Sequence, residues 1–574
     1  MNFTNKTTTL LISIAVAHVV SPASAAGPTT VRTPNNLKNA VVLYDSAKAP
    51  AVPNRVAVQS IPNSKMPADT ICNVESRVAY GDPAPHTGGG TLGTIAPFFD
   101  TTINSSGNVA FGSTVVGSDR NQGFFISNSD GTVNAVAIGC GDFGGGGDTT
   151  SVCGDPSPIG GKISGLFFYT PSINNAGDVV FISDVNGGSA RRALFVFHAA
   201  TRTLEKVAAP GDPSPIGGVF DSVSPGVISN SGKVFFLALP TPGSFDSDLF
   251  MWENGVVTKV AATGDPAPGG GTYSIIGSQS VGYVDGTSMP IGPLPDINDS
   301  DVITFRAIVS GGITDRGIIV RTNGVDQWYV KVPDPTPAGG TYLSMEAPSI
   351  NNAGQVSFFA DYHPTPDTFN SGWFAGAPGN WRKVLIFGDS VDGGEVLGLA
   401  ISNNPEHEID AAGNVFVWAN LDSNGTEDRL LYSLTDGSLL VVARNGDPTP
   451  LGGTFNGMSP WPTIDKENGG IFGAYTPGAQ GGVLNAYFTF EHCADAITLQ
   501  ARVKGQGTNH NVQLKWSPAD GGRVSLIRNG SAIGNTIDDG RVTDKLGTQT
   551  GSFTYKICET DSGDCSNEVT VTIP

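Results

Sequence analysis

The chain is poor in the side chains that carry most enzymatic and metal chemistry. Its 574 residues include 6 Cys and 7 His, and no Walker A string, HExxH or CxxC pair occurs. The stretch GCGDFG at 139–144 matches GxGxxG, but no amphipathic helix follows it to offer an N-terminus to a phosphate. The sequence therefore argues against the common nucleotide-binding and zinc-hydrolase classes.

Basic residues are also scarce. Lys and Arg number 32 against 52 Asp and Glu, which gives a formal net charge of −20. Phosphate binding needs a basic surface, so nucleic acid and anionic membranes are excluded as partners. Solubility is the simplest reason for the acidic charge, and cation binding is the alternative.

Long hydrophobic runs are limited to one, LLISIAVAHVV at 10–20. Lys6 precedes it, and the A-x-A pattern Ala23-Ser24-Ala25 follows it. A run this short, with these flanks, is typical of a signal peptide. We expect residues 1–25 to be removed and the mature protein to be secreted, with no membrane insertion.

Glycine and proline are abundant, at 76 and 39 residues, and they recur in a pattern. GDPSPIGG occurs at 154–161 and again at 211–218. Looser copies make seven elbows, whose Asp residues are Asp82, Asp155, Asp212, Asp265, Asp334, Asp389 and Asp447. In such an elbow Pro stops strand pairing, Gly lets the backbone bend and Asp caps the turn. A carboxylate ring for a metal is the less economical interpretation.

A second signature follows each elbow, as in INNAGDVVF at 173–181. Asn, Asp or Ser caps a tight turn between two alternating apolar runs, which indicates a β-hairpin. A second hairpin follows in most repeats, as at Asn254-Gly255. Four short antiparallel strands in each of seven repeats predict a seven-bladed β-propeller. A β-solenoid and a string of sandwiches are the alternatives.

The repeats resemble the bacterial NxxGxxAF tandem-repeat proteins through the NxxGxxxF signature and the GDPAPGG-type elbows. Asp301 and Asn468 stand where two repeats lack the signature glycine. The resemblance covers residues 72–493 and implies export and a repeat β-fold, with no catalytic residues to transfer. Residues 26–71 are left as a partly irregular lead segment.

Residues 494–574 have a different pattern. Trp516, the turn IRNG at 527–530, and TYKICE with CSNEVTV at 554–571 resemble the fibronectin type III-like, immunoglobulin-like sandwich domains at the C-termini of secreted bacterial hydrolases. A Trp from an early strand and a Tyr from a late strand would pack in one core. Such modules space, dock or adhere.

Six cysteines in an exported chain suggest three disulfides. Cys558 and Cys565 flank the expected last turn of the tail, and Cys140 and Cys153 enclose a Gly-rich loop. Cys72 and Cys493 remain, one before the first repeat and one after the last. Repeat seven lacks a fourth strand, and residues 72–80 stand where a fourth strand belongs. We therefore expect the N-terminal strand to complete the last repeat, with a Cys72–Cys493 disulfide beside it.

In a propeller the NxxG and NG turns share one face, here called the turn face. The elbows and the second-to-third loops share the other, here called the loop face. The segments 360–372 and 275–295 read as long second-to-third loops, and variable loops on a rigid scaffold carry binding. We expect the site there.

The binding candidates on the loop face are Arg120, Arg192, Arg316, Arg429, Tyr362 and His363. The four arginines each precede a predicted third strand and are expected at equivalent positions. They either latch neighbouring blades through Asp or form a basic spot for an acidic glycan.

Two further chemistries stay open. Some propeller lyases pair His or Tyr with Arg, and that set would come from His363, Tyr362, Tyr283 and Arg316. The segment 422–428 offers Asp422, Asn424 and Asp428 to Ca²⁺, although a polar turn explains it equally. No other cofactor is expected.

The sequence thus predicts a secreted, monomeric, non-catalytic binding or adhesion protein for an extracellular glycan or surface protein. A carbohydrate-active enzyme, either a polysaccharide lyase or a glycoside hydrolase, is the alternative.

Overall fold

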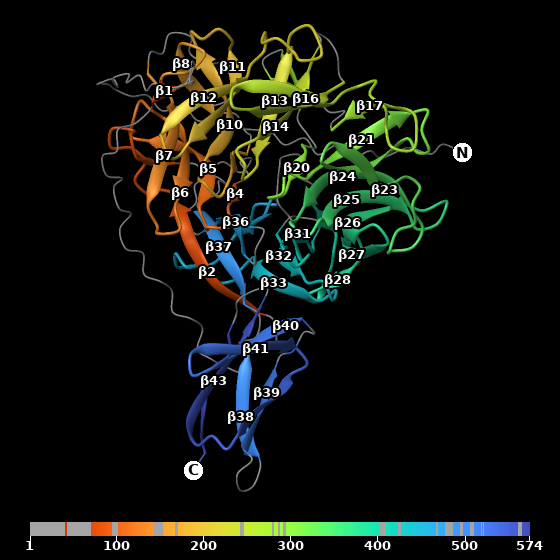
Figure 1. Ribbon diagram of the computed structural model, residues 1–574. Coiled ribbons are helices and arrows are strands. Elements are labelled where there is room, and N and C mark those ends of the chain that lie inside the picture. Colours follow the sequence, from red (N-terminus) through yellow and green to blue (C-terminus); the bar gives the residue numbers. More distant parts are fainter. Residues whose placement is uncertain are drawn as a thin grey trace.

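The computed structural model describes most of the repeat region and most of the C-terminal region (Figure 1). The described residues are 41–42, 70–93, 101–141, 153–166, 170–240, 246–277, 281–284, 287–290, 294–400, 409–422, 426–465, 469–476, 486–493, 497–504, 510–517, 519, 522–560 and 565–573. The predicted signal peptide lies outside them. Every element within them is a strand, and none forms a helix that could cross a membrane.

The repeats form antiparallel sheets that follow one another along the chain. The first sheet contains β3 (Thr91–Leu92), β4 (Thr102–Ile103), β5 (Val109–Val116), β6 (Gln122–Ser127) and β7 (Val133–Gly139). The second contains β8 (Lys162–Leu166), β9 (Ser172–Ile173), β10 (Val179–Asn186), β11 (Arg192–His198) and β12 (Thr203–Ala208), with β1 (Val41–Val42) on the outer edge of β12. The third contains β13 (Ser222–Ile228), β14 (Val234–Leu239), β15 (Asp248–Glu253) and β16 (Val256–Ala261).

The next three sheets continue this order. The fourth contains β17 (Thr272–Ile276), β20 (Asp296–Ile297), β21 (Ile303–Ser310), β22 (Arg316–Thr322) and β23 (Val325–Lys331). The fifth contains β24 (Thr341–Ile350), β25 (Val356–His363), β26 (Asn370–Ala377) and β27 (Asn380–Ile386). A small hairpin, β28 (Ser390–Val391) and β29 (Gly394–Glu395), leads into the sixth, which contains β30 (Gly398–Leu399), β31 (Val415–Asn420), β32 (Asp428–Ser433) and β33 (Leu439–Arg444).

The seventh sheet takes its outer strand from the other end of the repeats. It contains β34 (Gly457–Met458), β35 (Thr463–Ile464), β36 (Gly469–Tyr475), β37 (Ala486–Cys493) and β2 (Thr70–Ala79). Ala79 pairs with Ala486 and Thr70 with Cys493, and Figure 1 shows β2 beside β37. The expectation that the N-terminal strand completes the last repeat is confirmed. The side chains of Cys72 and Cys493 lie outside the described residues, so their disulfide stays a prediction.

Hydrophobic clusters hold neighbouring sheets together. Separate buried clusters join the second sheet to the third, the third to the fourth, the fourth to the fifth, the fifth to the sixth and the sixth to the seventh. Another contains Val78 and Tyr487 of the seventh sheet together with Phe111 and Phe181 of the first two. Burial of the alternating apolar residues thus holds neighbouring sheets together.

One predicted loop is placed differently. Residues 275–295 are not a second-to-third loop, because β17 and β20 both pair with β21 and so form two halves of one strand. The segment between them contains the hairpin β18 (Val281–Val284) and β19 (Thr287–Pro290). The segment therefore interrupts the first strand of its sheet and does not join the second strand to the third. Residues 360–372 do join β25 to β26, as expected.

The C-terminal strands form a separate lobe (Figure 1). One sheet contains β38 (Thr498–Lys504), β39 (His510–Ser517) and β42 (Arg541–Gly547), and the other β40 (Arg523–Arg528), β41 (Ser531–Ile537), β43 (Gly551–Glu559) and β44 (Val569–Ile573). Trp516 and Tyr555 belong to one core shared by both sheets. Cys558 and Cys565 form the expected disulfide.

Candidate functional site

The NxxG turns are capped by the first residue of each signature. Asn104 Oδ1 accepts the backbone N–H of Asn108 at 3.0 Å, and Asn351 Oδ1 accepts that of Gln355 at 2.8 Å. The same contact occurs at Asn174, Ser229, Asn298, Asp410 and Asp465. The predicted capping role is therefore confirmed in all seven turns.

These caps also connect the turns to one another. Asn104 Nδ2 donates to Asn174 O at 2.8 Å, and Asn174 Nδ2 donates to Ser229 O at 3.2 Å. Asn298 and Asn351 repeat this toward the next turn, where Asn351 Nδ2 donates to Asp410 O at 2.7 Å. One carboxamide thus closes its own turn and bonds the next sheet, which requires both a donor and an acceptor.

The residues that directly follow the caps are exposed and form a second row. They also hydrogen-bond from one turn to the next. Asn175 Oδ1 accepts the N–H of Ser105, and Asn230 Oδ1 accepts that of Asn175. Asp299 accepts the side-chain amides of Asn230 and Asn352. Because turns of successive sheets bond each other, they lie on one side of the molecule.

The two rows surround a small polar cavity. Its volume is about 30 Å³, enough for roughly one water molecule. Its lining comes from the turns of the first four sheets together with Asp465 of the seventh. Isoleucines from four turns lie beneath it: Ile103, Ile173, Ile228 and Ile297. Among the described residues, this part of the turn face thus holds about one water molecule between side chains that hydrogen-bond one another.

The elbows use their Asp residues as predicted. Asp212 Oδ2 accepts the N–H of Ala209 at 2.8 Å, three residues earlier. Asp82, Asp265, Asp334, Asp389 and Asp447 cap the same i−3 position. The turn-cap interpretation is confirmed, since every elbow carboxylate is engaged locally.

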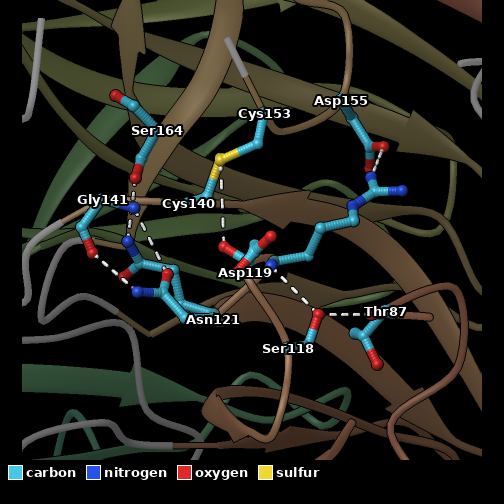
Figure 2. The surroundings of a disulfide bond; sticks show 11 residues. Thr87, Ser118, Asp119, Asn121, Cys140, Gly141, Cys153, Asp155 and Ser164 are labelled. Carbon is cyan, nitrogen blue, oxygen red and sulfur yellow. Dashed lines mark hydrogen bonds and ion pairs between the residues drawn. A yellow bond between two sulfur atoms is a disulfide. The ribbon is translucent and has the colours of Figure 1, made fainter. Parts of the chain in front are cut away.

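Asp155 reaches its cap across an insertion. It accepts the N–H of Ile138 at 2.7 Å, 17 residues earlier, because a Gly-rich loop is inserted between them. The predicted Cys140–Cys153 disulfide closes that loop at its base (Figure 2). The bridge therefore returns the chain to the point where an uninterrupted repeat would place the elbow.

The four arginines do not occupy one position. The second strands β10 and β21 are equivalent and begin at Val179 and Ile303. Five residues after each start, the paired residue on the third strand is Arg192 in one sheet and Arg316 in the other. In the first and sixth sheets, the residues at this paired position are Gln122 and Asp428. Arg120 therefore lies two residues before the equivalent position, and Arg429 lies one residue after it. The predicted equivalence is wrong for these two, because loop length before the third strand varies.

Each arginine is also paired with an acid. Arg120 bonds Asp155 of the following elbow. Arg192 Nε lies 2.8 Å from Asp184 within its own sheet, and Arg316 bonds its neighbour Asp315 at 3.1 Å. Arg429 Nε lies 2.8 Å from Asp392. Only Arg120 makes the expected latch to the next repeat, and a basic spot for an acidic glycan loses its support.

Tyr362 and His363 are neighbours on β25 that point to different environments. Tyr362 is buried and packs edge-on against Phe374. Its candidacy as a surface contact is wrong, because strand alternation turns it into the core. His363 is partly exposed, and its Nδ1 lies 2.7 Å from Thr368 O. The side chain of Tyr283 lies outside the described residues, so the lyase set is not brought together among those described.

The calcium candidates serve the local backbone. Asp422 accepts from Thr426 and Glu427, and Asp428 is buried and accepts from Asn420 and Met458. Asn424 lies outside the described residues. Among those described, no three metal-binding side chains come together.

One charged group was missed. Arg306 is buried on β21 where the second and third repeats have Ile182 and Leu237. Its Nε lies 3.2 Å from Glu346 and donates to Met345 O at 3.0 Å. Aligning the repeats position by position would have exposed this exception.

Glu346 has a second acid nearby. Burial raises the pKa of Glu346, Arg306 opposes this shift and the charge of Asp361 adds to it. Asp361 accepts hydrogen bonds from the hydroxyls of Ser344 and Ser371. A carboxyl with a raised pKa beside a second carboxylate can in principle donate a proton.

These features define an all-β protein whose antiparallel sheets are linked through capped turns. The chain belongs to a family of unknown function, DUF7453, whose model matches residues 152–281 and 271–485. No curated protein matches the sequence.

Several solved structures are similar over large parts of the chain. A protein of unknown function from Dyadobacter fermentans is 8% identical with a TM-score of 0.29, and the match covers 73% of this chain and 99% of that one. A post-proline cleaving enzyme from Rickettsia typhi is 10% identical with a TM-score of 0.30, covering 66% and 49%. An engineered GH43 glycoside hydrolase is 10% identical with a TM-score of 0.22, covering 84% and 92%. All three TM-scores lie below 0.5, so neither fold nor function is inferred from them.

Proposed function

We propose that the chain is an extracellular, non-catalytic binding or adhesion protein, built as a seven-bladed propeller with a C-terminal fibronectin type III-like sandwich. Two observations support the propeller: buried hydrophobic clusters lie between successive sheets, and β2 pairs with β37. The core shared by Trp516 and Tyr555 supports the sandwich. Two disulfides in the described residues suit an oxidising compartment.

One observation carries the non-catalytic assignment. The polar candidates are each engaged within the protein: the arginines in ion pairs, His363 with Thr368 and Tyr362 in the core. A catalytic site needs such groups to converge on a substrate. A rigid scaffold with loops gathered at one face instead suits binding.

The test is a polysaccharide panel read in two ways, as retention of the protein and as new unsaturated or reducing ends. We expect retention on at least one polymer without new ends. New ends formed by the purified protein would overturn the non-catalytic assignment.

A carbohydrate-active enzyme is the second candidate, and the placement of Glu346 and Asp361 on the neighbouring strands β24 and β25 favours it. Most glycoside hydrolases use two carboxyl groups, one on either side of the scissile bond. If the panel shows new reducing ends, Glu346→Gln should abolish them and Glu395→Gln, on the exposed hairpin β28–β29, should not.

A further inference from the structure

The exposed large apolar side chains are concentrated on the loop face. Among the described residues, those on or beside elbows and second-to-third loops are Tyr80, Val116, Ile216, Val219, Ile313, Leu343, Phe369, Leu397 and Leu451. Val256 and Val325, beside third-to-fourth turns, are the two others in the repeats. Most repeats therefore contribute an apolar tip to the same face, which in a soluble protein marks an interaction surface.

At four elbows, the charge of the capping Asp is neutralised by a lysine. Lys206, from the preceding fourth strand, lies 2.7 Å from Asp212, and Lys259 lies 2.7 Å from Asp265. Lys331 and Lys383 pair with Asp334 and Asp389 in the same way. At these four elbows the lysine thus neutralises the capping carboxylate, which lowers the charge that they present to a partner.

The geometry points to an uncharged polysaccharide as the partner of the loop face, an inference that rests on the proposed binding function and names its ligand class. The C–H faces of neutral sugar rings would pack on Phe369, Tyr80 and the aliphatic tips. The hydroxyl groups of the sugars would hydrogen-bond the Lys–Asp pairs, so that these charged groups would keep polar partners when the ligand binds.

Two other surfaces fit less well. A lipid bilayer would have to desolvate the Lys–Asp pairs that alternate with the apolar tips, and burying ion pairs costs more than it returns. An acidic glycan would need basic residues that are free, and the predicted arginines are paired. A second copy of the chain would press two sets of ion pairs together.

The experiment measures the binding of the full mature chain to microcrystalline cellulose and to chitin. The loop-face variant combines Ile313→Ser, Phe369→Ser and Leu451→Ser, whose side chains are exposed in the folded protein. The matched control combines Val256→Ser and Val325→Ser, which are 59% and 70% exposed beside third-to-fourth turns. Circular dichroism melting confirms that both variants fold.

We expect the wild type and the control to bind a neutral polysaccharide equally and the loop-face variant to bind at least 10-fold more weakly. Equal binding by all three overturns this inference and leaves the proposed function intact. The same holds if the wild type binds only alginate, only phosphatidylcholine vesicles, or only itself as a concentration-dependent dimer. Retention on no polymer, vesicle or cell surface overturns both.

Discussion

At the residue scale, the turn caps show how much one side chain can fix. Asn351 is fully buried, accepts the N–H of Gln355 and donates to Asp410 O in the next sheet. A carboxamide reaches both partners, whereas the shorter Ser229 hydroxyl bonds Ser231 and an ionised Asp has no donor. The cap residue therefore sets both the turn and the spacing between neighbouring sheets.

Asn351→Asp should lower the free energy of unfolding by about 2–3 kcal/mol, because it retains the cap but places a carboxylate oxygen against the Asp410 carbonyl. Urea denaturation followed by tryptophan fluorescence measures this. The exposed Asn456→Asp makes the same change in charge and should be nearly neutral. Similar losses in both variants would show that charge, and not the inter-sheet bond, is responsible.

A second prediction concerns His198 on β11. Hydrogen bonds to Asp178 and Glu205 raise the pKa of His198 to about 9. A pKa raised above the unfolded value of 6.5 stabilises the fold fully below pH 6.5, and this contribution is lost as pH rises through 9. The contribution is on the order of 2–3 kcal/mol before solvent screening of this partly exposed side chain.

The measurement compares the wild type with His198→Gln by urea denaturation from pH 6 to pH 9.5. The difference between them should be largest at pH 6 and should shrink toward pH 9.5. Asp178→Asn should flatten the same profile. A difference that stays constant with pH would contradict the assignment.

At the element scale, repetition determined what the sequence could predict. Elbows and turns were correctly located because GDP and NxxG impose the same backbone constraints in each repeat, as the matching caps of Asp212 and Asn104 show. Side-chain partners were not predictable in this way. Whether Arg192 pairs within its sheet or Arg120 across to the next depends on one or two residues of loop length. The placement of residues 275–295 could have been read from the sequence, because they precede the turn signature INDSDVITF at 297–305 and therefore lie before the second strand.

The strand β2 is expected to be essential to the seventh sheet. A chain of residues 70–574 should melt within a few degrees of the mature protein, whereas residues 80–574 should lose the cooperative transition of the repeats. Removing β2 deletes the buried Val78 and the Arg77 bonds to Gly107 O and Asn128 O in the first sheet. It also exposes the edge of β37. Equal melting of the two chains by circular dichroism would show that β2 is dispensable.

At the scale of the whole molecule, the C-terminal lobe has the core of an independent domain. Its buried cluster draws only on residues 497–573, and the Cys558–Cys565 bridge lies within it. Small domains of this size fold alone when the core is complete. Residues 494–574 should therefore unfold cooperatively, as reported by the fluorescence of Trp516, the single tryptophan of this fragment.

Calorimetry of the mature chain should accordingly show two transitions, and one should coincide with that of the fragment. A fragment without a cooperative transition would mean that the lobe depends on the repeats.

The pairing of β2 with β37 also has a consequence for synthesis. The partner of Ala79 is Ala486, so the first repeat strand to be made must wait for nearly all of the others before it can pair. Contacts so distant along the chain form slowly. During synthesis from the N-terminus, the seventh sheet would be the last to assemble, and any chain cut short before β37 would display an unpaired β2. Truncated chains would thus be open to proteolysis at their N-terminal end, so that only full-length molecules persist.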